Sequence, residues 1–520
     1  MYLKKVNLLQ GGSRDNRSVC DNNFLLNGVI DHAKYLNKQV FITFYDYSTC
    51  FDSLWLEDSM ITLWDLGVRN ELFALIYKLN ETAKIRVKTP FGLTDEFECE
   101  RIVKQGTVLS SNLCSSSTAQ LCDFNITGGT YTGSFVINDL LYVDDTIDVN
   151  DEVNETVSSH HEVMNFSKCK RLGVNHKKCG HLTVNKKAHH HNPTLTIGDG
   201  IIPQVSCTKS LGDMVNEKGN NRDLIDDKVK NAKAAMVNCL SMCNEVTLGL
   251  FFVTSAIILY ESVFLATLLS NCQTWRNLNN EDYKKLEVTQ LRYLKRVMKA
   301  PLSTPNAFVF LEFGALPVKR ILHIRQLSFL HHIVCLDSDD PVRKMFESQQ
   351  QLPFEKNWAN EVIPLLDEYL LSEYDIRNMS KPAWKEIVKV NVTHAAMAQL
   401  SSDIKFKTKT KHLSYNFFNS QSYMHHFSHK QASIIFKLRS FSIDCKGNRK
   451  SANNDITCRL YKAADETQQH VINCPLVRVN GTPLDLSKVL SCDFTAGDKE
   501  ILEICRRVDE FNKLVNETDN

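Results

Sequence analysis

The stretch LLYVDDTIDVN, residues 140–150, places two aspartates side by side at the end of an apolar run. Neighbouring carboxylates repel each other and lose hydration when they are partly buried, so an ordinary hydrophobic core seldom contains such a pair. A divalent cation beside the two carboxylates would offset both costs. The stretch therefore favours a fold in which a buried strand ends in a bend, with Asp144 and Asp145 at a cation site.

The length and charge of the chain limit what can surround this bend. A chain of 520 residues, 43% of them hydrophobic, exceeds what one hydrophobic core normally holds, and we expect two to four structural units. The chain carries 61 Lys and Arg against 60 Asp and Glu, a net charge of +1. The net charge therefore gives no sign of nucleic-acid binding, and a surface that binds nucleic acid must be sought among local basic patches.

Two segments are locally basic. Residues 281–330 carry nine Lys and Arg against four acids, and residues 401–450 carry ten against two. Aromatic residues are interleaved in the second segment, at Phe406, Tyr415, Phe417, Phe418, Tyr423 and Phe427. Cations for phosphates and rings for bases suit single-stranded nucleic acid or a hybrid duplex, whereas solvated helix faces would have a similar composition.

The cysteines and the apolar segments bear on the compartment. The 17 cysteines follow no repeated spacing, and the start MYLKKVNLLQ is no secretory leader, so we expect an intracellular protein with free thiols. The apolar segment from Leu248 to Trp275 is long enough to cross a bilayer, but Glu261 lies at its middle. We predict a buried helix here and no membrane partner.

Short apolar runs alternate with helical patterns in the first part of the chain, which favours an α+β domain. The run QVFITFYDYS reads as a strand that ends in Asp46, and a helix is predicted to begin near Asp21. From about Asp223 to residue 400 the pattern is almost entirely helical. If the strand before Asp46 pairs with the strand of the opening motif, three carboxylates meet in a hard-oxygen site suited to two Mg²⁺ ions.

Five strings occur in order between about residues 8 and 215: QGGSRDNRSVCDN, FYDYSTCFDSL, VKQGTVLSSNLCSSS, LLYVDDT and RLGVNHKKC. Together they resemble the reverse transcriptase domain of non-LTR (LINE-type) retrotransposons. The resemblance implies an RNA-directed DNA polymerase with an RNA template, a DNA primer and dNTPs as partners. It also implies the following organisation: a right-hand polymerase palm of antiparallel sheet and helices with partial fingers (1–205), a helical thumb and extension (206–330), a helical linker (331–430), a degenerate zinc-knuckle region (431–478) and a tail (479–520).

The same resemblance implies roles for single residues. Asp46, Asp144 and Asp145 match the catalytic, Mg²⁺-binding aspartates, and Phe51 matches the bulky residue that excludes a ribonucleotide 2′-hydroxyl. The other positions that match are Tyr47, Gln105, Gly106 and Lys178 for the nucleotide, and Arg14 and Arg17 for template or phosphate.

Near the C-terminus, CRLYKAADETQQHVINCPL resembles the zinc knuckle of the same family, which uses three cysteines and one histidine. Cys458, His470 and Cys474 match three of the four Zn²⁺ ligands, but Tyr461 stands where the second cysteine is expected. Either Cys445 supplies the fourth thiolate or the site is weak or lost.

Departures from the family pattern bear on activity. Met1 lies only a few residues before the second finger motif, and no endonuclease segment is recognised on either side, so we expect a truncated copy of an element. The alternative to a polymerase is therefore a catalytically inactive remnant that only binds RNA or hybrid duplex. A chain too truncated to fold stably is a third interpretation.

Overall fold

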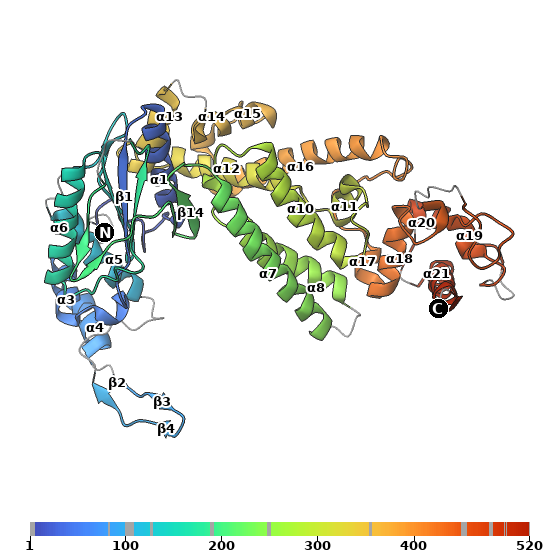
Figure 1. Ribbon diagram of the computed structural model, residues 1–520, viewed down its shortest axis with the longest axis horizontal. Coiled ribbons are helices and arrows are strands. Elements are labelled where there is room, and N and C mark those ends of the chain that lie inside the picture. Colours follow the sequence, from blue (N-terminus) through green and yellow to red (C-terminus); the bar gives the residue numbers. More distant parts are fainter. Residues whose placement is uncertain are drawn as a thin grey trace.

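A computed structural model of the protein describes most of the chain. The described residues are 6–81, 84–98, 109–124, 128–187, 192–246, 251–352, 356–448, 455–477, 482–492, 494–495 and 497–518. They form an elongated molecule in which a mixed region of helices and sheet lies at one end and helices form the rest (Figure 1).

A four-stranded antiparallel sheet organises the first part of the chain. Its strands are β1 (Val40–Tyr45), β8 (Asp139–Tyr142), β9 (Asp145–Asn150) and β10 (Gly180–Val184), and their order across the sheet is β10-β1-β9-β8. The predicted strand before Asp46 is thus confirmed as β1, and it lies directly beside the strand that follows the aspartate pair. The register pairs Phe41 with Asn150 and Tyr45 with Thr146.

Helices cover both faces of this sheet, because side chains alternate along each strand. On one face, β-strand residues such as Ile42, Ile147 and Leu182 pack against α1 (Val19–Tyr35) in a core that continues into the helical region. The other face packs against α6 (Val153–Cys169) and α5 (Ser110–Ala119). Figure 1 shows the sheet between α6 and α1.

The face toward α6 carries a polar row that crosses all four strands: His181, Thr43, Asp148 and Asp139 are cross-strand neighbours and each is at most 2% exposed. Asp148 accepts hydrogen bonds from Ser159 of α6 and from Asn150. Both carboxyl oxygens of Asp139 are buried without a hydrogen-bond partner among the described residues. Two carboxyl groups therefore face each other inside the sheet layer, and one of them lacks a donor.

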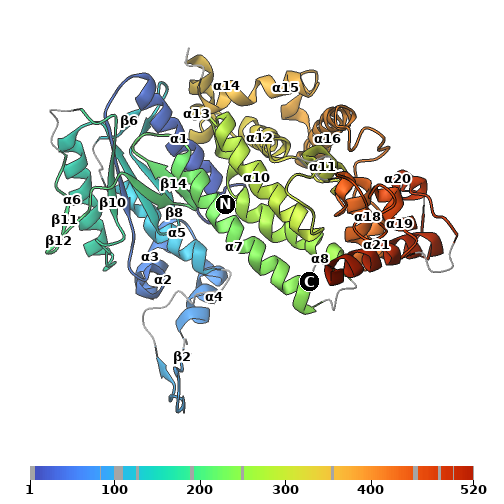
Figure 2. The same cartoon turned by 45° about the vertical axis from the view of Figure 1, so that its right-hand side comes forward.

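Smaller elements surround the sheet. A long hairpin projects from this end of the molecule (Figures 1 and 2). The elements are α2 (Cys50–Ser53), α3 (Leu56–Asp65), α4 (Asn70–Glu81), β2 (Lys84–Ile85), β3 (Lys88–Thr89), β4 (Gly92–Leu93), β5 (Phe97–Glu98), β6 (Thr130–Tyr131), β7 (Val136–Ile137), β11 (Thr196–Ile197), β12 (Gly200–Ile201), β13 (Cys207–Ser210) and β14 (Asp213–Asn216).

The predicted helical half is confirmed from Arg222 onward. Figure 2 shows α7 and α10 side by side, with α18–α21 at the C-terminal end. The helices are α7 (Arg222–Val246), α8 (Phe252–Leu259), α9 (Leu265–Leu268), α10 (Asn280–Val297), α11 (Asn306–Phe313), α12 (Val318–Val334), α13 (Pro341–Gln351), α14 (Trp358–Val362), α15 (Pro364–Glu368), α16 (Lys381–Lys405), α17 (Tyr423–His426), α18 (His429–Arg439), α19 (Gln468–Asn473), α20 (Ser487–Ser491) and α21 (Lys499–Thr518).

The apolar segment around Glu261 forms α8, one turn of π-helix (Tyr260–Phe264) and α9, rather than one uniform helix. It is half-buried and not fully buried as predicted, because Phe264 and Leu268 face the core while Ile258 and Glu261 face solvent. Within the described ranges, no helix combines the length and the apolar character that crossing a bilayer requires.

The start of α1 also differs from the prediction. Ser18 is the N-cap, and Asp21 lies three positions later, where its carboxylate accepts a hydrogen bond from the Ser18 backbone N–H in a capping box. A serine and an acid at this spacing satisfy two free N–H groups of the first turn, so the helix begins three residues earlier than an Asp21 cap would allow.

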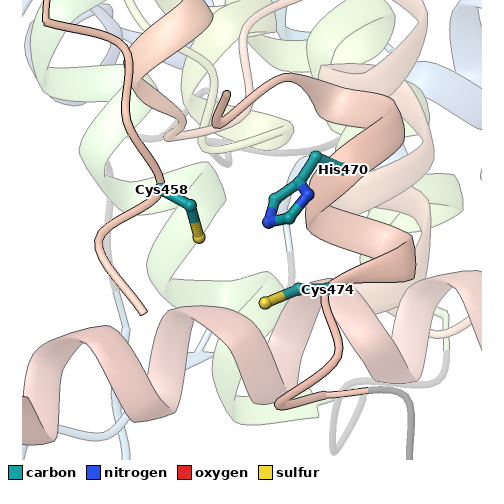
Figure 3. A group of neighbouring side chains, drawn as sticks. All are labelled: Cys458, His470 and Cys474. Atoms are coloured by element: carbon teal, nitrogen blue, oxygen red, sulfur yellow. The ribbon is translucent and has the colours of Figure 1, made fainter. Parts of the chain in front are cut away.

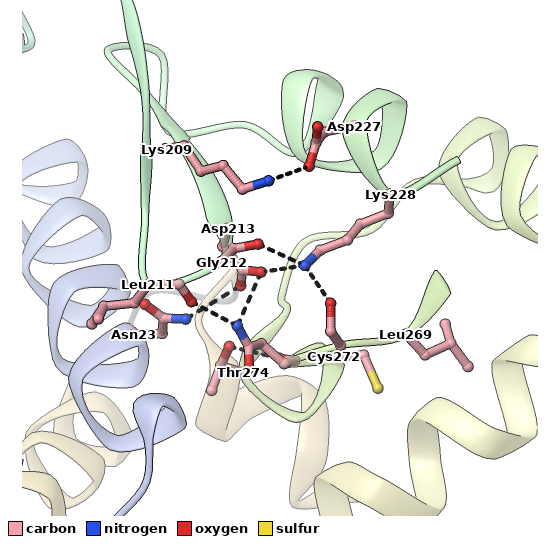
Figure 4. A network of polar contacts seen from close by, with 12 residues as sticks. Asn23, Lys209, Leu211, Gly212, Asp213, Asp227, Lys228, Leu269, Cys272 and Thr274 are labelled. Atoms are coloured by element: carbon pink, nitrogen blue, oxygen red, sulfur yellow. Dashed lines mark hydrogen bonds and ion pairs between the residues drawn. The ribbon is translucent and has the colours of Figure 1, made fainter. Parts of the chain in front are cut away.

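A buried ion pair fixes the helical half to the hairpin of β13 and β14 (Figure 4). Lys228 of α7 lies 2.7 Å from Asp213, and both side chains are less than 10% exposed. Lys228 also donates to the Gly212 carbonyl and to Ser270, while Asn271 donates to the Leu211 carbonyl and to Asp213. Three segments of the chain are thus held together by hydrogen bonds around one buried lysine.

Candidate active site

Three aspartates gather where β1 ends and where β8 turns into β9. Because Tyr45 pairs with Thr146, continuing the register by one residue sets Asp46 opposite Asp145. Asp144 occupies the two-residue turn, since Tyr142 pairs with Asp145. The sheet therefore brings the three predicted carboxylates together at one end of its strands, from segments about a hundred positions apart in the sequence.

The pKa values of Asp144 and Asp145 agree with the close approach of the three carboxylates. Loss of solvent around its carboxyl group, then the charges of Asp144 and Asp46, raises the pKa of Asp145 to about 6. Loss of solvent also raises the pKa of Asp144, with a smaller contribution from Asp46. Among the described residues Asp144 and Asp145 form no ion pair, and a bound cation would relieve the repulsion between their charges.

One more observation tests whether Mg²⁺ fits these residues. Asp46 Oδ2 is buried and has no hydrogen-bond partner among the described residues. The ammonium group of Lys178 is close to this oxygen, at 3.6 Å, but is itself 67% exposed. A hard oxygen ligand without a donor, beside two acids with raised pKa values, suits a divalent cation. Among the described residues, the ligand atoms of the three carboxylates do not all lie within 4.8 Å of one another.

The turn that carries Asp144 is strained and clamped. Val143 has a positive φ of 58°, a conformation that β-branched residues rarely adopt and that costs roughly 1–3 kcal/mol. Gln10 offsets this cost, because its side-chain oxygen accepts from the Val143 N–H at 2.9 Å. Thr118 and the Gln10 amide nitrogen both donate to the Val143 carbonyl.

Sequence reasoning missed Gln10 and Thr118, the two residues that position this turn. The signal near Gln10 was the Gly11-Gly12 pair: a Cβ on Gly12 would lie 2.4 Å from the Val143 backbone nitrogen, so the N-terminal segment can approach the turn only through glycine. No local pattern marks Thr118.

The other predicted nucleotide residues have different surroundings. Lys178 lies at the site through Asp46, as described above. Tyr47 is 4% exposed and packs below the site beside Val174, whereas Phe51, in α2, is partly buried. Gln105 and Gly106 lie outside the described residues.

The two predicted phosphate ligands are engaged within the protein. Arg14 donates to the carbonyl oxygens of Val6 and Asn7. Arg17 forms an ion pair with Asp340 of the helical half, and its side chain is 6% exposed. Their contact with template or phosphate stays a prediction.

A second group of chemistry-bearing side chains lies near the C-terminus. Ligand atoms of Cys458, His470 and Cys474 all lie within 4.8 Å of one another, and the three side chains point toward a common centre (Figure 3). His470 Nε2 is buried without a hydrogen-bond partner among the described residues. The group therefore suits a cation that cysteine and histidine ligands bind well, such as Zn²⁺.

Local contacts explain why these ligands converge. Buried Glu466 accepts from the backbone N–H groups of Lys446 and Arg459, which ties together the loops on either side of Cys458. Thr467 caps the helix that carries His470. Cys445 is buried but does not belong to the converging group, and Tyr461 is 42% exposed with its backbone N–H 3.3 Å from Cys458 Sγ.

Comparisons with known proteins bear on the first site. Residues 2–212 match the family model described as reverse transcriptase (RNA-dependent DNA polymerase). The chain therefore contains a reverse transcriptase domain, and the three aspartates lie within it. No curated protein matches the chain.

Among solved structures, the chain is similar to three structures of telomerases from two Candida species. Apo telomerase from Candida tropicalis has 14% identity and a TM-score of 0.32, over 72% of this chain and 56% of that one. A form truncated from its C-terminal domain has 16% identity and a TM-score of 0.29, over 38% of each chain. Candida albicans telomerase, in complex with a TWJ fragment of telomeric RNA, has 13% identity and a TM-score of 0.31, over 75% of this chain and 55% of that one. The chain thus spans 38% to 56% of the length of these telomerases.

Proposed function

We propose that this chain is an RNA-directed DNA polymerase of a non-LTR (LINE-type) retrotransposon, which adds dNTPs to a primer 3′-hydroxyl. One observation carries the proposal: the β1–β9 register sets Asp46 opposite Asp145, beside Asp144, within the segment that matches the reverse transcriptase family. In right-hand polymerase terms, the four-stranded sheet is the palm and α7 to α10 belong to the thumb.

Each residue of the site has a chemical task in this proposal. Asp46, Asp144 and Asp145 would hold two Mg²⁺ ions, which when bound activate the 3′-hydroxyl and neutralise the charge on the leaving pyrophosphate. Lys178, exposed beside Asp46, would meet the triphosphate and balance its charge. Phe51, five residues after Asp46, would occupy the space of a ribonucleotide 2′-hydroxyl.

The group of Cys458, His470 and Cys474 supports the assignment to a LINE-type element, but it has no task in nucleotide addition. Cys458, His470 and Cys474 would hold Zn²⁺ in a knuckle whose fourth ligand is water or another group from outside the cluster, because tyrosine is a poor ligand for structural zinc. In this proposal the knuckle survives Tyr461 with reduced affinity.

Primer extension on an RNA template tests the proposed activity. The purified full chain should incorporate dNTPs with Mg²⁺, and Asp144→Asn should lower the rate by at least about a thousandfold, since it removes a metal ligand. Asp199→Asn, an exposed acid on the β11–β12 hairpin, is the matched control and should retain the full rate.

Three outcomes separate the alternatives. Incorporation that depends on Asp144 supports the polymerase. RNA binding without incorporation would favour the binding-only remnant. Incorporation that survives Asp144→Asn would contradict the assignment of these carboxylates.

A further inference from the structure

A cavity of about 650 Å³ lies where the N-terminal end of α1 meets α12 and the first three turns of α16. Its walls include Arg17, Arg325, Lys381, Lys385 and Lys389. Among the described residues that line it, none is acidic. The reverse transcriptase match ends at residue 212, so it assigns no role to the walls that α12 and α16 contribute.

Much of the positive charge at this cavity is uncompensated. Lys381, Lys385 and Lys389 are exposed, and within the described parts of the chain none of them forms an ion pair. They follow each other at intervals of four residues, so they share one face of α16 and repel one another by a few tenths of a kcal/mol per pair. One guanidinium nitrogen of Arg325 donates a hydrogen bond to the Leu269 carbonyl at 2.6 Å. The guanidinium group has further N–H donors.

Two features indicate the class of anion. At a rise of 1.5 Å per residue the three lysines span about 12 Å, which is longer than a single phosphate and suits a run of phosphates. Among the described lining residues the one carbocyclic aromatic ring is that of Phe329, which is 6% exposed and cannot stack on a base. The cavity therefore offers cations for phosphates but no exposed carbocyclic ring on which a base could stack.

We propose that this cavity and the Lys381-Lys385-Lys389 row bind the sugar–phosphate backbone of a single nucleic-acid strand, at a site separate from the three aspartates. The choice of a nucleic acid over another polyanion rests on the proposed polymerase function. RNA and DNA strands share the chemistry that the site recognises. Binding here requires neither dNTP nor catalysis.

Fluorescence anisotropy with the full chain tests the proposal, in buffer without divalent cations. Labelled 20-nucleotide RNA and DNA strands of one sequence are titrated at several salt concentrations. Lys385→Ala/Lys389→Ala should raise Kd about tenfold for at least one strand and lower the slope of log affinity against log salt by about 1.4, or 0.7 for each lost contact. Lys499→Ala/Lys513→Ala removes the same charge from the exposed face of α21 and should change neither quantity by a comparable amount. Lys385→Arg/Lys389→Arg should retain binding.

Lysine acetylation followed by mass spectrometry locates the strand. A bound strand should protect Lys381, Lys385 and Lys389 from acetylation but leave Lys499 and Lys513 reactive. Comparing the RNA and DNA arms decides which strand binds more tightly. Equal Kd values for the alanine variant and its control, or protection by inorganic tripolyphosphate but by neither strand, would overturn the proposal. Because no turnover is measured, an inactive polymerase would leave this test intact.

Discussion

Asp139 and Asp148 face each other across β8 and β9, in a layer that excludes water. Burial raises the pKa of Asp148 to about 7, and burial together with the charge of Asp148 raises the pKa of Asp139 well above its usual range. The pair therefore holds at least one proton near neutral pH. Asp148 accepts hydrogen bonds from Ser159 and Asn150, whereas Asp139 accepts none among the described residues. Ionisation therefore costs most free energy at Asp139.

This pair predicts a stability that falls as pH rises. Both carboxyl groups bind protons more tightly in the folded than in the unfolded chain, so the stability they contribute is complete below pH 4 and is lost as pH rises through about 7. Asp139→Asn removes one ionisable group and should raise the free energy of unfolding at pH 8 by about 1–3 kcal/mol relative to the wild type.

Urea unfolding at pH 5 and pH 8, followed by tryptophan fluorescence, measures this effect. Asp199→Asn is the exposed control and should leave the pH dependence as it is in the wild type. An Asp139→Asn protein that loses as much stability as the wild type between the two pH values would show that Asp139 does not contribute to the pH dependence.

Between elements, the junction of α7 with the β13–β14 hairpin contains two Lys–Asp pairs in very different surroundings (Figure 4). Lys228 and Asp213 are buried at 2.7 Å, whereas Lys209 is 53% exposed at 3.3 Å from Asp227. Lys228→Met leaves Asp213 buried and unpaired, and should lower the free energy of unfolding by about 3–5 kcal/mol. Lys209→Met should lower it by at most about 1 kcal/mol, because solvent screens the exposed pair.

Thermal unfolding of the two variants side by side checks this difference. Each variant removes one lysine from the same junction, so a change in net charge alone would affect both alike. Equal losses of stability would mean that the buried pair does not fix α7 to the sheet region.

The proposed Zn²⁺ site of Cys458, His470 and Cys474 leads to a further prediction. Tyr461→Cys restores the fourth ligand that the family pattern expects, and should raise the affinity for Zn²⁺ at least about tenfold over the wild type, while Cys458→Ser should lower it. Competition with a zinc-sensitive dye measures both. Tyr461→Ser separates the new thiolate from the mere loss of the ring, since it lacks a good zinc ligand. Affinity unchanged by Tyr461→Cys would place the fourth ligand elsewhere.

Across the whole molecule, sequence patterns predicted the strands and helices that depend on residues close together in the chain. Apolar runs predicted β1 and the strand that ends at the aspartate pair, β8, and from them the approach of Asp46 to that pair. The strand that pairs with β1 is instead β9, which begins at Asp145. What the patterns missed depends on residues far apart in the chain. Arg17 is adjacent in sequence to other polar residues, yet its partner Asp340 lies in the helical half. The lysine row on α16 resembles any solvated face until the fold sets it beside α1.

The site itself shows the same division. Local sequence indicated the three acids, and the family resemblance indicated Lys178. The strained Val143 and its hydrogen bonds with Gln10 and Thr118 were not predicted, because bonds between segments distant in the sequence leave no periodic signal. The approach of Cys474 to Cys458 was predicted, because both cysteines belong to one short motif that resembles a zinc knuckle.

Cleavage of the backbone by bound Fe²⁺ tests whether Asp46, Asp144 and Asp145 hold metal ions together. With ascorbate and peroxide, Fe²⁺ in the site cuts the backbone close to its ligands. We predict cuts near Asp46 and near Asp144 in the same protein, suppressed by excess Mg²⁺ and absent in Asp144→Asn/Asp145→Asn, while any cut near Cys458 persists. Cuts near Asp144 without cuts near Asp46, or a pattern that excess Mg²⁺ leaves unchanged, would contradict a shared metal site.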